Sequence, residues 1–186
     1  MTLRLRQYGR IVSLEQQVAA AVEAKRAAES DPDDPALAAA FVEQATSIAA
    51  YEWDAFDAVL PLLGDSDSVR RGAAASILGR VGHAHRALAQ TVCDSLIAVG
   101  AEEVDDGVVD TLAVAAHEAG LTVGAACNLL LRTPPLRRMG AYHLAMVVSS
   151  APDDEPIRKV LRIAADDPDP EVRRWVELGL ETASQD

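Results

Sequence analysis

Four similar segments recur along the chain, and they constrain its fold more than any other feature. They begin at Val69, Val104, Leu136 and Val172, at spacings of 35, 32 and 36 residues. Each opens with an aliphatic residue and two charged ones, and carries small or aliphatic residues four and eight positions after the first. Offsets of four and eight lie on one face of an α-helix. A repeat of this length, with one apolar helical face per unit, predicts stacked helical hairpins.

Each segment is expected to be the second helix of a hairpin, because an apolar helical run precedes it. These preceding runs cover about residues 52–63, 85–99, 121–132 and 155–166. Ser68, Thr133 and Asp169 stand where helix N-caps are expected, the last two directly before a proline. No segment shows sustained alternation with a period of two, so essentially no strand is expected.

Two further helices are predicted near the N-terminus. Ser13 to Gln16 has the form of a capping box that opens a helix to about Glu29. An Asp-Pro-rich stretch, 30–35, separates this helix from another over about 36–50. We therefore expect one all-α domain over residues 1–186, with four hairpins in 51–186 and N-terminal helices in 1–50. Those N-terminal helices either cap the stack or form a fifth repeat.

Composition narrows the class of protein. Apolar residues make up 49% of the chain but aromatic residues only 4%, so the core is expected to be filled by small aliphatic side chains. The net charge of −12 disfavours nucleic acid and anionic membranes as partners. We expect a cytoplasmic protein, because the sequence shows no secretion signal, membrane span or disulfide pattern. The excess of arginine over lysine is typical of high-GC bacterial genomes.

Two stretches resemble the HEAT-like (armadillo-type) helical repeat. Residues 60–71 have a proline in the first helix, an Asp-containing turn and a Val-Arg pair, and residues 163–174 resemble them. The segment at Leu136 lacks the Asp turn, and the segment at Val104 has aspartates in place of the arginines. The resemblance implies a right-handed α-α superhelix whose second helices line a concave face. Members bind proteins there, some bind nucleic acids or pigments, and a few are enzymes.

Three arginine pairs occupy equivalent positions near the starts of the second helices: Arg70 and Arg71, Arg137 and Arg138, and Arg173 and Arg174. They are the candidate binding residues, because a ladder of guanidinium groups along one edge would hold an anionic partner. The alternative is that each pair binds aspartates of nearby turns, namely Asp65, Asp67, Asp167 and Asp169. The abundance of adjacent acids favours this alternative.

No metal, cofactor or catalytic site is predicted. Only His117 is followed by a glutamate, so the several His-Glu pairs of di-iron repeat proteins are absent from the sequence. Cys93 and Cys127 lie in apolar runs and are expected to be buried thiols. Trp175 is expected to cover the last hairpin as part of a terminal cap.

Three functions remain open at this point. The first is a non-enzymatic adaptor that binds another protein through its concave face and inter-helix loops. The alternative is an acidic immunity-type inhibitor of a basic toxin or enzyme. The second alternative is a HEAT-like enzyme, either similar to bilin lyases or similar to DNA glycosylases, in which Trp53, Tyr142 and Trp175 would act beside the arginines. The sequence leaves the oligomeric state open.

Overall fold

Helices form most of the chain in its computed structural model, which describes residues 5–7 and 10–182. The expected all-α fold is confirmed, with 79% of the structure helical. The α-helices are α1 (Leu14–Ser30), α2 (Pro35–Ala49), α3 (Trp53–Val59), α4 (Ser68–Ala84), α5 (Ala89–Gly100), α6 (Asp106–Ala119), α7 (Val123–Leu129), α8 (Pro134–Ser150), α9 (Glu155–Ile163) and α10 (Pro170–Thr182). Short 3-10 helices, η1 (Leu60–Gly64) and η2 (Ala164–Asp166), extend α3 and α9.

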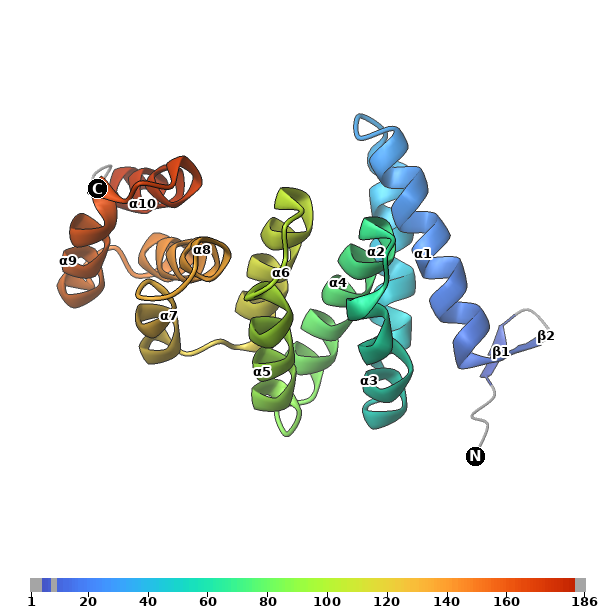
Figure 1. The fold of residues 1–186 in the computed structure, drawn as a ribbon. Helices are drawn as coiled ribbons and strands as arrows, with labels where there is room; N and C mark the ends of the chain where they lie inside the picture. Colours follow the sequence, from blue (N-terminus) through green and yellow to red (C-terminus); the bar gives the residue numbers. More distant parts are fainter. Residues whose placement is uncertain (1–4, 8–9, 183–186) are drawn as a thin grey trace.

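The helices follow one another in chain order from one end of the molecule to the other, with α1 and α10 at opposite ends (Figure 1). Each even-numbered helix packs on the next, α4 on α6, α6 on α8 and α8 on α10. Each of these even-numbered helices also packs on the odd-numbered helix before it in the chain, as α6 does on α5 and α8 on α7. One cluster of buried apolar side chains runs from Val18 in α1 to Val176 in α10. This arrangement is compatible with a helical-repeat fold.

The faces predicted to be buried on the second helices are buried. The positions four and eight residues into each segment are largely inaccessible, with only Leu180 half-buried: Ala73, Ile77, Val108, Leu112, Gly140, Leu144 and Val176. Small residues let these helices approach closely. A Cβ at Gly79 would lie 2.8 Å from the Cα of Ala115, and a Cβ at Gly179 would lie 2.9 Å from the Cα of Ala145. The low aromatic content therefore goes with closely spaced helices.

The capping box at the N-terminus is confirmed. Ser13 Oγ accepts from the backbone N–H of Gln16 at 3.3 Å, and Ser13 N–H donates to Gln16 Oε1 at 3.1 Å. The helix that it opens, α1, ends at Ser30, one residue beyond the predicted end. The predicted helix over 36–50 is α2, which begins at Pro35.

Two predicted helix starts are wrong. Val104 lies outside α6 and its side chain is 91% exposed, because Asp105 is the N-cap and accepts from the N–H of Val108 at 3.1 Å. Ser68 is the first residue of α4 and not its cap, which is Asp67, accepting from Val69 N–H at 2.9 Å. In both places a carboxylate satisfies the free N–H groups at the start of the helix.

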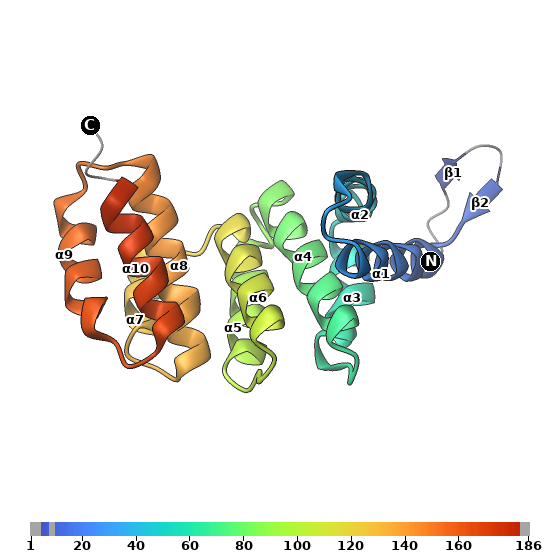
Figure 2. The ribbon, with the colours of Figure 1, turned by 90° about the horizontal axis from the view of Figure 1, so that it is seen from above.

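One short strand pair departs from the prediction of essentially no strand. Residues Leu5–Gln7 (β1) and Arg10–Val12 (β2) form an antiparallel pair in which Leu5 lies opposite Val12. Figure 2 shows this pair at the end of the molecule beyond α1. Strands of three residues are too short to show alternation with a period of two, so the pattern gave no signal. No helix in the described ranges is both long enough and apolar enough to cross a membrane.

Candidate binding surface

Arg71, a predicted binding residue, is held between two hairpins. Its Nε and Nη2 donate to the two carboxylate oxygens of Glu103 at 2.7 and 2.9 Å, and its Nη1 donates to the backbone oxygen of Asp65 at 3.0 Å. The Glu103 side chain is only 4% exposed. Burial alone would raise the pKa of Glu103, but hydrogen bonds from Arg71 and from the N–H groups of Asp105 and Val104 lower it below its ordinary value.

Arg138 makes the corresponding connection two hairpins further along. Its Nε donates to Asp169 at 2.8 Å, and its Nη1 pairs with Asp106 at the start of α6. Arg71 and Arg138 thus each reach an acid 31 or 32 residues later, at the start of the next second helix. Arg137 also forms an ion pair, with Asp167 at 3.0 Å. These guanidinium groups join neighbouring hairpins.

The remaining predicted arginines are exposed but have local partners. Arg70 pairs with Asp65 at 2.8 Å, and Arg173 donates to the backbone oxygen of Asp167 at 2.7 Å. Arg174 pairs with Glu171 at 3.2 Å and lies over the ring of Trp175, 5.5 Å from its centroid. The predicted ladder therefore consists of contacts with the chain's own acids and backbone. Binding of a partner by the exposed arginines stays a prediction.

A row of three rings crosses the second helices, and we call it the ring row: His117 on α6, Tyr142 on α8 and Trp175 on α10. Tyr142 meets His117 edge to face at a centroid distance of 5.9 Å and Trp175 in the same manner at 4.8 Å. All three rings are partly exposed. Trp175 thus contacts the preceding second helix, where the sequence predicted a cover for the last hairpin. Such edge-to-face contacts fix the orientation of the rings.

Exposed apolar side chains and a carboxylate lie on the helices that carry the ring row. Val114 and Leu178 lie three residues from His117 and Trp175 on the same helices and are 38% and 42% exposed. Asp110 lies seven residues before His117 on the same face of α6. Its pKa is raised by burial and by the nearby Glu171 carboxylate, against the lowering effect of Arg138 and Arg174. The surface therefore offers rings, apolar side chains and a crowded carboxylate.

A buried histidine, His143, contacts the His117 end of the ring row. His143 Nδ1 lies 3.1 Å from His117 Nδ1, so one ring donates a hydrogen bond and the other accepts it. His143 is 4% exposed, and burial together with the His117 ring lowers its pKa to about 4. Burial also lowers the pKa of His117. Both rings are accordingly neutral at pH 7, which suits a pair that shares one proton.

The described residues include no group of three or more His, Cys, Asp and Glu side chains placed to hold a metal ion. Burial raises the pKa of the Cys93 thiol to about 11, and it also raises that of Cys127. Cys93 is therefore a thiol at neutral pH, which agrees with the predicted buried side chain and is unfavourable for a nucleophile.

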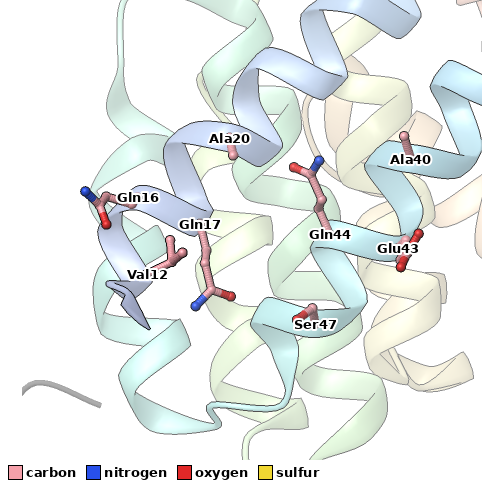
Figure 3. A pocket seen from close by; sticks show the side chains of 8 residues that line it. All are labelled: Val12, Gln16, Gln17, Ala20, Ala40, Glu43, Gln44 and Ser47. Atoms are coloured by element: carbon pink, nitrogen blue, oxygen red, sulfur yellow. The ribbon is translucent and has the colours of Figure 1, made fainter. Parts of the chain in front are cut away.

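A hollow of about 460 Å³ lies at the opposite end of the molecule, between α1 and α2 (Figure 3). Its lining combines three small or aliphatic residues with amides, a hydroxyl and a carboxylate: Val12, Gln16, Gln17, Ala20, Ala40, Glu43, Gln44 and Ser47. The hollow could not be predicted from the sequence, because glutamines on amphipathic helices carry no signal that separates a lining position from a solvated one.

Comparisons with known proteins do not assign a family. No family model matches the chain, and no curated protein matches it. The crystal structure of an engineered protein from the Northeast Structural Genomics Consortium is similar over 92% of this chain and 91% of its own, at 17% sequence identity and a TM-score of 0.41. This likeness is too weak to carry a conclusion about fold or function.

Proposed function

We propose that the chain is a HEAT-like scaffold, a short right-handed α-solenoid that binds another protein in the cytoplasm through the ring row. Two observations support the solenoid: consecutive second helices pack on one another, and close glycine contacts recur between them. The free cysteines Cys93 and Cys127 suit a reducing compartment.

The ring row is the observation that carries the proposal. Tyr, Trp and Arg are the residue types that contribute most binding energy at protein interfaces, and they do so in patches where the rings are already ordered. Tyr142, Trp175 and Arg174 meet at one place, held by ring contacts on both sides of Tyr142. Exposed Val114 and Leu178 extend the patch with apolar area. A partner would bury these groups with little loss of side-chain freedom.

The charge around the ring row indicates the chemistry of the partner. Asp110 is crowded by Glu171 and half-buried, so a cation placed beside it would relieve the repulsion. The net charge of −12 attracts basic proteins at long range. We therefore propose a protein partner that presents an apolar side chain to the rings and a lysine or arginine to Asp110.

The test uses substitutions at exposed positions, so that the fold is preserved. The tagged chain captures proteins from lysate of its own organism in three forms: wild type, a double variant V114D/L178D, and a matched control L131D/I163D. Leu131 and Ile163 are 84% and 75% exposed on loops and helix ends away from the ring row. We expect a basic protein held by wild type and control and lost from the ring-row variant. Equal retention by all three forms would contradict the proposed surface.

An activity assay of the captured protein separates the adaptor from the acidic inhibitor. An inhibitor must abolish an activity of the captured protein when the two are mixed in equal amounts. An adaptor leaves the partner active and holds it next to a third protein.

A further inference from the structure

The hollow between α1 and α2 contains a hydrogen-bond acceptor that lacks a donor. Gln44 Oε1 is buried, and none of the described residues donates to it. An unpaired buried polar atom destabilises the folded protein, because it has lost its hydrogen bond to water. A ligand that donates to Gln44 removes this cost.

A second amide faces the same space in an orientation fixed by its partner. Gln17 Nε2 donates to the hydroxyl of Tyr51 at 3.0 Å, which leaves Gln17 Oε1 as an acceptor. Figure 3 shows Gln17 on α1 and Gln44 on α2, with their amides on the two sides of the hollow. Glu43 adds a carboxylate on α2, and no cationic side chain lines the hollow. The lining therefore selects a positively charged donor.

Shape restricts the donor further. Val12, Ala20 and Ala40 give the hollow an apolar wall, against which an alkyl chain can lie. A guanidinium group carries five N–H donors in one plane, has no acceptor and does not lose its charge near neutral pH. It carries enough N–H donors for the acceptors of Gln44, Gln17 and Glu43, whereas an ammonium group is a compact charge without a planar fork. A volume of about 460 Å³ is ample for an arginine side chain.

We propose that the hollow between α1 and α2 binds an alkyl guanidinium group, with Gln44, Gln17 and Glu43 as the acceptors. The group comes either from an arginine in a protein chain or from free arginine. This site lies on the N-terminal helices, apart from the ring row, so it stands or falls independently of the proposed function.

The test is a titration of the ¹⁵N-labelled full chain, followed by the side-chain amide signals of Gln17 and Gln44. The probes are N-acetyl-arginine methylamide, free arginine, and N-acetyl-citrulline methylamide, in which a neutral urea replaces the guanidinium. We expect millimolar binding of an arginine probe, since one side chain makes few contacts. The citrulline probe should bind at least tenfold more weakly. Tighter binding of the methylamide than of free arginine assigns the source to a protein chain, and the reverse order assigns it to the small molecule.

Two variants locate the site. Gln44→Met removes the unpaired acceptor, keeps the length of the side chain and suits a helix, and we expect at least fivefold weaker binding. Glu43→Gln should weaken binding by a similar factor, whereas Asp57→Asn, which removes an exposed carboxylate of α3, should not. Equal binding of the arginine and citrulline probes overturns the proposal. Unchanged amide signals of Gln17 and Gln44, or equal effects of Glu43→Gln and Asp57→Asn, do so as well.

Discussion

Acid should weaken this fold through His143 before it affects most carboxylates. The folded protein holds the pKa of His143 at about 4, well below its ordinary value of 6.5. A group whose pKa is lowered by folding stabilises the protein fully above the unfolded value, and this stabilisation is lost as the pH falls towards the folded value. The window for His143 therefore runs from about pH 6.5 down to about pH 4.

The size of the effect follows from the two pKa values. They differ by about 2.5 pH units, and each unit corresponds to about 1.4 kcal/mol, so complete protonation costs about 3 kcal/mol. By pH 5 the loss should be about 2 kcal/mol. The physical reason is that an imidazolium at His143 would be buried and would lie beside His117, whose own positive charge would repel it.

The assay is urea unfolding at pH 7.5, 6.5, 5.5 and 5.0, followed by helical circular dichroism. His143→Gln does not titrate, so the free energies of unfolding of wild type and variant should converge by about 2 kcal/mol between pH 7.5 and 5. His83→Gln is the matched control, because His83 is exposed on the last turn of α4. Its curve should stay parallel to that of the wild type. A His143→Gln curve that also stays parallel would refute the buried histidine pair.

Four further predictions concern contacts between hairpins, an exposed ion pair and the buried thiol. Gly79→Ala should lower the free energy of unfolding, measured with urea, by about 1–3 kcal/mol more than Gly124→Ala does. A Cβ at Gly79 meets the backbone of α6, whereas one at Gly124 meets nothing within 4 Å. Glu103→Ala should cost about 2 kcal/mol in the same assay, because it leaves a largely buried guanidinium without its two hydrogen bonds. Glu155→Ala breaks an exposed ion pair and should leave the unfolding midpoint unchanged. Cys93 should react with a thiol reagent at pH 8 only after unfolding, and rapid labelling of the folded protein would contradict its burial.

The helices and their buried faces could be predicted from the sequence because both depend on local patterns. The capping box at Ser13 and the buried stripes through Ala73 and Ile77 follow from spacing alone. The start of α6 could not be predicted in this way. Two adjacent aspartates, Asp105 and Asp106, are both suitable caps, and Glu103 just before them accepts a hydrogen bond from Arg71 of another hairpin. Such a contact between residues 32 positions apart is invisible to a local pattern.

The candidate surface was harder to predict than the fold. The arginine pairs were predicted as binding residues because they stand at equivalent repeat positions. Arg71 and Arg138, however, form ion pairs with acids of the next hairpin. Tyr142 and Trp175 stand at different positions of their segments, seventh and fourth, so aligning the repeats does not bring them together. Their contact depends on how far α8 and α10 slide past one another, which side-chain packing decides.

The most direct test of the proposed surface is site-specific photo-crosslinking to the partner. A photoreactive phenylalanine is placed singly at Val114, beside the ring row, and at Leu131, an exposed apolar position outside it. Both proteins are irradiated in lysate of the source organism. We predict a crosslink to one basic protein from position 114 and none to that protein from position 131. A crosslink to the same protein only from position 131, or equally from both, would contradict binding through the ring row.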